Sequence, residues 1–226
     1  MDAMVFDFDG VVVDSEPVHL VCFRRVLKAV GVELSEREYY TRYLGFDDRD
    51  CIRQAAEDHG VQLAEHRVVQ LIDAKTRLVQ WMFRESIAAL PGAAELIHAA
   101  HDAGVPLAIC SGALREEIEL AATTVGVRDC FSVIVPAEDV ERGKPDPQGY
   151  RLALARLREA SGRKIRAAAS VVVEDAPAGI DAAHAAQMRV LAVTTSYPAD
   201  ALSAADRIVA SLADVTPTSL EELVAD

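Results

Sequence analysis

The sequence carries little positive charge for its length. It has 23 Lys and Arg against 36 Asp and Glu in 226 residues, which gives a formal net charge of −13 at pH 7. Proteins that bind nucleic acids or anionic membranes usually present a basic face. The deficit therefore argues against both kinds of partner. It leaves room for a local cation site, because a bound metal ion is not counted in the charge of the sequence.

Cysteine is scarce, and long hydrophobic runs are absent. The four cysteines, Cys22, Cys51, Cys110 and Cys130, show no CxxC spacing, so neither a zinc site nor a disulfide framework is indicated. No apolar run approaches the about 18 residues that suggest a transmembrane helix, and the first apolar stretch begins too close to Met1 for a signal peptide to precede it. We therefore expect a cytoplasmic protein with reduced cysteines.

The apolar residues that are present have the pattern of a buried parallel sheet. Hydrophobic residues make up 51% of the chain and charged residues 26%, an ordinary balance for a globular protein. Five short apolar runs end in small or polar residues: AMVFDFDG, VPLAICSG, FSVIVPAED, ASVVVEDA and MRVLAVTT. Continuous apolar runs separated by helical patterns are typical of parallel strands with helical crossovers. The predicted fold class is α/β, with a Rossmann-like parallel sheet core.

A helical insert is predicted between the first run and the second. The gap between Gly10 and Val105 is too long for one crossover helix, and its apolar spacing is helical. The two predicted apolar faces are Val18, Val21, Cys22, Val26 and Ala29, and Val68, Leu71, Ile72, Leu78, Val79 and Met82. SERE has the pattern of a capping box, and FDDRD that of a second helix start. We predict an α/β core of residues 1–15 and 88–226, with a small all-helical domain at 16–87.

Polar side chains follow the predicted strands, where ligands bind in an open parallel sheet. These residues are Asp7 and Asp9 after the first run, Ser111 and Gly112 after the second, Lys144 after the third, and Glu174 and Asp175 after the fourth. The set suits phosphoryl transfer. Mg²⁺ takes oxygen ligands, which Asp7 and Asp175 supply. Ser111, the backbone N–H groups after it at a predicted helix start, and Lys144 are suited to hold phosphate oxygens.

The pair Asp7 and Asp9 lies in the stretch MVFDFDGVVVDSE. Side chains two apart in a strand point the same way, so we expect both carboxylates to face one volume. Two like charges that close repel each other, and one takes up a proton unless a cation lies between them. A metal ion lets Asp7 stay ionised, while Asp9 carries a proton. Taken alone, such a motif at a strand end is more often a simple turn than a catalytic pair, but the four matched strand ends make a simple turn improbable here.

Four stretches, DFDGVVVDS, CSG, RGKPDP and VVVEDAPAGI, resemble the four motifs of the haloacid dehalogenase-like (HAD) phosphohydrolase superfamily, in the right order and over nearly the whole chain. The similarity is to its capped phosphatase and β-phosphoglucomutase-like members. It implies the strand order 5-4-1-2-3 and makes the helical insert a cap domain. It also implies that Asp7 is the nucleophile that becomes an aspartyl-phosphate, and that Asp9 is the acid and then the base.

The same resemblance implies a set of metal and phosphate ligands. Mg²⁺ is expected to bind the carboxylates of Asp7 and Asp175 and the backbone carbonyl of Asp9. Glu174 is expected nearby, or to act through water. The implied phosphate-binding residues are Ser111, Gly112 and Lys144.

Four residues of the insert are candidate substrate contacts: His19, Gly45, Asp48 and Lys75. His19 follows the first motif, although a lone histidine on a helix is more often a packing or surface residue. Lys75, among apolar neighbours, is most simply a helix lysine whose ammonium reaches solvent. In similar capped proteins, however, a lysine near this point reaches the active site. Gly45 and Asp48 belong to YLGFDDRD, which is either a helix–helix turn or, as in similar proteins, a loop that closes over substrate.

Other reactions of the superfamily are disfavoured by particular residues. Dehalogenases lack the second aspartate, which is present here as Asp9. Phosphonate-cleaving relatives need a Schiff-base lysine, and neither Lys28 nor Lys75 has a surrounding pattern of that kind. A β-phosphoglucomutase-like enzyme must grip a second phosphate with a cap cation, but the LGFDDRD loop has Asp47 and Asp48 there, with Arg49 beside them.

The sequence thus predicts a Mg²⁺-dependent phosphatase that acts through an aspartyl-phosphate. The expected partner is a small phosphorylated metabolite, such as a sugar phosphate or a phosphoglycolate-like compound, bound by a monomer or dimer. A sugar phosphomutase remains the alternative. A non-catalytic protein that binds phosphorylated ligands is the other, and it would be expected to lack Asp7, Asp9 or Asp175, all of which are present.

Overall fold

The chain divides into two compact units, which we describe separately. The computed structural model describes residues 1–44 and 46–225, so the candidate contact Gly45 lies outside the described residues. One unit, the α/β unit, comprises Met1–Asp14 and Ile87–Asp226, and the other, the helical unit, comprises Ser15–Ser86. No helix among the described residues combines the length and the apolar character needed to cross a membrane.

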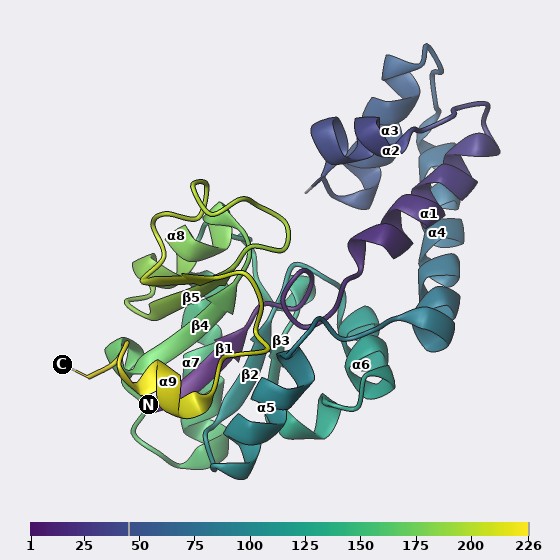
Figure 1. Cartoon of the computed structure of the whole chain (residues 1–226). Helices are drawn as coiled ribbons and strands as arrows, with labels where there is room; N and C mark the ends of the chain where they lie inside the picture. The colour runs from purple at the N-terminus through teal and green to yellow at the C-terminus, as the bar shows by residue number, and fades with distance from the viewer. Residues whose placement is uncertain (45, 226) are drawn as a thin grey trace. The chain divides into compact units, whose positions relative to one another are not determined.

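The α/β unit is built on a parallel sheet of six strands (Figure 1). The strands are β1 (Ala3–Phe6), β2 (Leu107–Cys110), β3 (Val133–Val135), β4 (Ser170–Glu174), β5 (Arg189–Val193) and β6 (Arg207–Val209). Their order is β3-β2-β1-β4-β5-β6, which confirms the predicted order of the first five and adds β6 beside β5. Every residue of β1 to β4 is buried, as expected for strands covered on both faces.

Helices cover both faces of this sheet. They are α5 (Ala93–Asp102), α6 (Arg115–Thr124), α7 (Gln148–Ser161), α8 (Pro177–Ala185) and α9 (Pro217–Glu221), with 3₁₀ turns at Arg128–Cys130, Ala137–Asp139 and Ala167–Ala169. Tyr150 and Leu154 of α7 and Ile180 of α8 share one core cluster with Val5 and Val172 of the central strands. Figure 1 shows α5 and α9 on the opposite face of the sheet.

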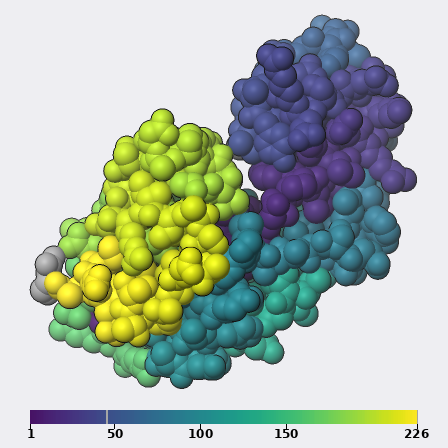
Figure 2. All heavy atoms as spheres, viewed as in Figure 1, coloured from purple at the N-terminus to yellow at the C-terminus, as the bar shows by residue number. Residues whose placement is uncertain are grey.

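The segment after β5 completes the α/β unit. In Figure 2 its yellow-green to yellow atoms spread over the visible face of this unit. Leu202, Leu212 and Leu220 anchor it, because each is at most 2% exposed. Burial of such leucine side chains contributes on the order of 2 kcal/mol each, which anchors the segment to the α/β unit.

The helical unit contains four α-helices and one π-helix among its described residues. They are α1 (Glu16–Lys28), α2 (Glu36–Glu38), the π-helix Tyr39–Tyr43, α3 (Asp48–Asp58) and α4 (Glu65–Ser86). Two predicted starts are confirmed: Ser35 and Glu38 form the capping box of α2, and the Asp47 carboxylate accepts the Asp50 N–H at the start of α3, 2.8 Å away. These contacts satisfy N–H groups that have no partner within the helix.

The buried face of α1 differs in part from the predicted one. Val18, Cys22 and Val26 are buried as expected, whereas Val21 is 45% exposed and Ala29 is exposed at the end of the helix. The core instead takes up Leu20, Phe23 and Leu27. Because α1 contacts both α3 and α4, it buries two adjacent stripes, and a single stripe of helical spacing identifies only one of them.

Candidate active site

Asp7 and Asp9 lie just beyond β1, which ends at Phe6. The Asp7 N–H donates to the Val173 carbonyl of β4 at 2.9 Å, and the chain then turns tightly, with the N–H groups of Val12 and Val13 bonded to the Phe8 carbonyl. Neither aspartate is part of the strand, so the turn after β1, and not strand alternation, positions the two carboxylates. The turn sends the two side chains to different partners.

Lys144 is the cation at the centre of the site. Its Nζ lies 2.8 Å from Asp7 Oδ1 and 2.6 Å from Glu174 Oε1, and it sits over the Tyr150 ring at 5.2 Å from the ring centroid. Burial works to lower the pKa of Lys144, but the carboxylates of Asp7 and Glu174 outweigh it and raise this pKa well above the usual value. Lys144 is therefore a permanent positive charge beside Asp7.

Glu174, the last residue of β4, is fully buried and holds Lys144 in place. Besides Lys144, its Oε1 accepts the Tyr150 hydroxyl at 2.7 Å. Its Oε2 accepts the N–H groups of Asp175 and Ala176 at 2.9 and 3.1 Å. Both oxygens are thus committed to protein donors, as buried carboxylates require. This arrangement makes Glu174 a positioning group for Lys144.

Asp175 and the turn after β1 are in close contact. Gly10 has a φ of 74°, and a Cβ at this position would overlap the Asp175 carboxylate, so both the conformation and the space require glycine. The Ser196 hydroxyl donates to Asp175 Oδ2. Burial raises the pKa of Asp175 to about 7, with the Ser196 hydrogen bond opposing the rise and Glu174 adding to it.

The cluster of carboxylates fits a divalent cation with oxygen ligands. One oxygen each from Asp7, Glu174 and Asp175 lies within 4.8 Å of the others. Burial raises the pKa of Asp7, Lys144 opposes that rise, and Glu174 and Asp175 add to it, so this cluster has more negative charge than one ammonium balances. A hard cation such as Mg²⁺ suits an all-oxygen set. Because Glu174 is committed to four donors, Asp7 and Asp175 are the ligands that the geometry favours.

Ser111 follows β2 and faces Asp9. Its Oγ donates to Asp9 Oδ2 at 3.4 Å and accepts the Ala113 N–H at 3.0 Å. The sequence predicted a helix start directly after Ser111. This prediction was wrong, because α6 begins only at Arg115. Gly112 and Ala113 form a loop instead. Ser111 therefore lies in a loop and contacts Asp9, and Lys144 lies in another loop and contacts Asp7.

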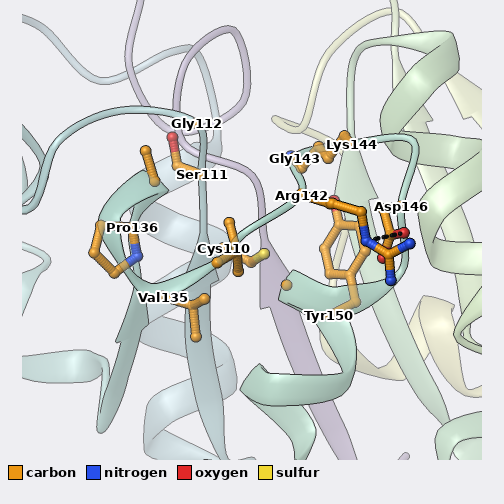
Figure 3. A pocket seen from close by; sticks show the side chains of 13 residues that line it. Cys110, Ser111, Gly112, Val135, Pro136, Arg142, Gly143, Lys144, Asp146 and Tyr150 are labelled. Carbon is orange, nitrogen blue, oxygen red and sulfur yellow. Dashed lines mark ion pairs between the residues drawn. The ribbon is translucent and has the colours of Figure 1, made fainter.

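A pocket of about 350 Å³ opens beside Ser111, Gly112 and Lys144. Figure 3 shows it between the loops that follow β2 and β3, with Val135 and Pro136 on one side and Tyr150 on the other. Arg142 and Asp146 pair at 3.1 Å beside it. The lining contains neither Asp7 nor Asp9. The residues expected to bind phosphate therefore line this pocket, whereas the carboxylates of the first motif do not.

In the helical unit, Lys75 is buried, which corrects the expectation that its ammonium reaches solvent. It is 2% exposed, and it donates to the Asp48 carboxylate and, at 3.0 Å, to His19 Nδ1. Its Nζ also lies 4.3 Å from the centroid of the Phe23 ring. A buried ammonium needs such partners. Three of the four candidate contacts, His19, Asp48 and Lys75, thus form one polar cluster.

Two residues of the site were missed in the sequence. Tyr150 lies in the first turn of α7 with no motif to mark it, and it is recognised only by its bond to Glu174. Ser196 follows the fifth strand, so the rule that polar residues after parallel strands line the ligand edge identifies it as a candidate. Both support carboxylates and lie outside the four motifs.

The comparisons with known proteins agree with this site. A family model described as haloacid dehalogenase-like hydrolase matches residues 4–193. The validoxylamine A 7'-phosphate phosphatase of Streptomyces hygroscopicus subsp. limoneus is 31% identical over 211 residues, covering 93% of this chain and 94% of that protein. These matches include all four strand-end motifs.

Solved structures share the fold. CbbY from Rhodobacter sphaeroides, in complex with phosphate, superposes with a TM-score of 0.82 at 27% identity, covering 95% of this chain and 96% of that one. A mutant of that protein was solved with xylulose-(1,5)bisphosphate. The β-phosphoglucomutase of Clostridium difficile has a TM-score of 0.79 at 19% identity, covering 100% and 97% of the two chains, which shows a shared fold alone.

Replacing Gly179 tests the packing around Glu174. Glycine to alanine inside a helix normally stabilises by about 0.5–1 kcal/mol, but a Cβ at Gly179 would overlap the buried Glu174 carboxylate. We expect Gly179→Ala to lower the free energy of unfolding by about 1–3 kcal/mol, as measured by denaturant titration. Gly143→Ala is the matched control, because a Cβ there meets nothing within 4 Å. A stabilised Gly179→Ala protein would contradict the described position of Glu174.

The neutral state of His19 makes a second prediction. Burial, and next the ammonium of Lys75, lower the pKa of His19 from 6.5 to about 3. Below pH 6.5 the unfolded chain binds a proton at His19 that the folded unit does not. The free energy of unfolding therefore decreases as the pH is lowered, by roughly 2 kcal/mol at pH 5. Thermal unfolding followed by Trp81 fluorescence measures this fall. His19→Asn should reduce it, and His66→Asn, at an exposed site, should not. An equal fall in all three proteins would contradict a neutral, partly buried His19.

Proposed function

The chain belongs to the haloacid dehalogenase-like hydrolases and is a phosphatase, and from this premise we propose that it hydrolyses a small phosphate monoester with Mg²⁺ through a phosphorylated Asp7. The observation that carries the proposal is the position of Asp7 at the end of the central strand, 2.8 Å from Lys144. A nucleophilic carboxylate must be ionised. The adjacent ammonium favours that state in a buried site.

In the first half of the proposed reaction, an oxygen of Asp7 attacks phosphorus and the bond from phosphorus to the leaving oxygen breaks. The Asp9 carboxyl gives its proton to that oxygen as general acid. Ser111 Oγ, 3.4 Å from Asp9 Oδ2, supports the orientation of Asp9. Lys144 offsets the negative charge on the non-bridging oxygens as it develops.

In the second half, Asp9 has lost its proton and acts as the base. It takes a proton from a water molecule whose oxygen attacks phosphorus, and the bond between phosphorus and Asp7 breaks, which restores the Asp7 carboxylate. Glu174 contributes by keeping Lys144 in place through its 2.6 Å contact. Ser111, Gly112 and Lys144 together bind the phosphate oxygens in this proposal.

The proposed metal is held by the carboxylates of Asp7 and Asp175 and by the backbone carbonyl of Asp9. When bound, Mg²⁺ supplies the positive charge that lets Asp7 and a dianionic phosphate come together. The carboxylate oxygens within 4.8 Å of one another support this role. Ser196 orients Asp175 by donating to it.

The proposed substrate is a phosphorylated sugar or a similarly small polar metabolite. The compounds named for the relatives support this class: validoxylamine A 7'-phosphate for the Streptomyces phosphatase, and xylulose-(1,5)bisphosphate in complex with the CbbY mutant. His19, Asp48 and Lys75 are proposed to contact its organic part. This proposal is supported by the clustering of the three side chains, because the buried Lys75 ammonium donates to both Asp48 and His19.

A phosphomutase activity is the alternative, and one contact bears against it. Arg49, the only cation of the LGFDDRD loop, pairs with Glu65 of α4, and Asp48 pairs with Lys75. A mutase needs a cation available for the second phosphate of its bisphosphate intermediate. In the helical unit Arg49 already has a carboxylate partner, so phosphatase activity remains the proposal.

Metal removal and product analysis test the proposed function. With a hexose 1-phosphate and Mg²⁺ we expect free phosphate and no 6-phosphate isomer, with or without a bisphosphate primer. Chelation should abolish turnover, Mg²⁺ should restore it, and Ca²⁺ should not, because Ca²⁺ takes a looser and larger coordination shell. Phosphate release by colorimetry and isomer by NMR measure the two products. Full activity in excess chelator, or isomer appearing faster than phosphate, would overturn the proposal.

The two aspartates of the first motif are distinguished by their asparagine variants. Asp7→Asn should abolish all turnover, because an amide cannot form the acyl phosphate. With an aryl phosphate, whose leaving group needs no acid, Asp9→Asn should still phosphorylate Asp7 but lack the base for hydrolysis. Rapid-quench kinetics should show a burst near one equivalent followed by slow turnover, with phosphate on Asp7 by mass spectrometry.

The control for this pair is Asp200→Asn, at an exposed position of the α/β unit, which should turn over at the parent rate. Steady turnover of Asp9→Asn at that same rate would remove Asp9 from proton transfer. Turnover by Asp7→Asn would remove Asp7 as the nucleophile.

A further inference from the structure

A cationic groove lies between α1 and α4 of the helical unit. Its volume is about 480 Å³. We call it the α1–α4 groove and define it by Arg25, Arg67, Arg77 and Trp81, with the small residues Ala29 and Ala74 between them. Neither His19 nor Lys75 lines it, so it does not share residues with the polar cluster described above.

Three arginines, Arg25, Arg67 and Arg77, line this one groove of an acidic chain. The protein has a net charge of −13, yet no carboxylate is found in the described lining of the groove. Of the six other arginines described in the helical unit, three pair with acids: Arg42 with Asp58, and Arg49 and Arg53 with Glu65. Within the described residues, Arg25 and Arg77 form no salt bridge, and Arg67 donates only to the neutral Gln70 amide, at 2.9 Å. The groove thus presents cations that the protein itself does not neutralise.

An aromatic residue accompanies these cations. Trp81 is the only tryptophan of the chain, and it is 57% exposed, more than any other large hydrophobic residue among those described. Tryptophan and arginine are the residue types that most often dominate binding energy at protein interfaces. Leu71 and Leu78 add apolar surface between the arginines. The combination is that of a surface that binds an acidic partner with apolar side chains.

The dimensions of the groove favour an elongated partner. Arg67 and Trp81 are both on α4, and at about 1.5 Å per residue they lie roughly 21 Å apart along its axis. Ala29 and Ala74 have small side chains, which allow a third helix to approach the helix pair closely. A helix laid in a groove contacts it through apolar residues at spacings of three, four and seven. We propose that the α1–α4 groove binds an acidic amphipathic helix of a partner protein.

A second copy of this chain fits the groove less well. In a twofold dimer the same surface meets itself, so the three arginines of one copy would face those of the other and repel. An anionic membrane would meet the same arginines, and the vesicle arm of the test separates it from a helix. Charge complementarity and the length of the groove along α4 favour an elongated acidic segment, and the other two occupants become outcomes of the test.

The experiment uses the full chain and a synthetic helical peptide of about 15 residues, long enough to span the groove. The peptide carries leucines at helical spacing on one face and glutamates on the other, and a scrambled peptide of the same composition is its control. Trp81 fluorescence and isothermal titration calorimetry measure binding. We expect one peptide per chain, a blue shift of the Trp81 emission, and weaker binding when salt is raised from about 50 to about 300 mM.

Charge-reversal variants locate the binding. Arg77→Glu should weaken the binding of the helical peptide about tenfold or more, because one attractive contact becomes repulsive. Arg37→Glu, an equal change of charge at an exposed position of α2 in the same unit, should bind as the parent does. Both variants should keep the parent unfolding midpoint, since neither side chain is buried.

Four outcomes would overturn the proposal. The first is equal binding of the helical and scrambled peptides, and the second is an equal loss of peptide binding in Arg77→Glu and Arg37→Glu. The other two assign the groove to a different occupant. Self-association in sedimentation equilibrium that Arg77→Glu abolishes would assign the groove to a second copy. Binding to phosphatidylserine vesicles that is lost in Arg77→Glu, with no binding of the helical peptide, would assign it to a membrane. The phosphatase assay is separate from all of these readouts.

Discussion

The ion pairs that Lys144 forms with Asp7 and Glu174 are the interaction on which the rest of the site depends. Parallel pairing of Phe6 with Val173 brings the residues after β1 to the edge where β4 ends, and Lys144 reaches both from the loop after β3. Buried ion pairs rarely add net stability, because desolvation opposes the attraction between the charges. The arrangement is better explained by what it does to Asp7, because Lys144 opposes the rise in the Asp7 pKa that burial and the neighbouring carboxylates cause.

The surrounding fold is shaped to hold these charges. The buried Glu174 carboxylate has four donors, two of them from the backbone at the end of β4. Glycine at positions 10 and 179 leaves the space that the carboxylates of Asp175 and Glu174 occupy. These contacts come from β4, α7, α8 and the turn after β1, so the position of Lys144 is set by several elements that pack independently onto one sheet. Such support limits the movement of a catalytic group.

Helix α4 of the helical unit carries cationic side chains in two different environments. On one side of α4, Lys75 is buried against Asp48 and His19, and it is satisfied within the unit. On another, Arg67 and Arg77 border a groove without a carboxylate in its described lining. The first arrangement neutralises a charge at the expense of conformational freedom, and the second leaves charge available to an external partner. The same helix therefore combines an internal polar cluster with a surface suited to binding.

The sequence by itself determined the first five strands and the side chains at their ends, because continuous burial and polar termination are local properties of a parallel strand. The order of these strands was implied by the resemblance of the motifs to a known family, and β6 was not predicted. The sequence also determined the capping box at Ser35 and the start of α3. Only the tertiary structure decided which of those side chains meet. Tyr150 and Glu174 are 24 residues apart and His19 and Lys75 are 56 apart, and no periodicity links them. The burial of Lys75 was likewise decided by packing, since a lysine among apolar neighbours can reach solvent or a buried carboxylate, and only the position of α3, which carries Asp48, distinguishes the two.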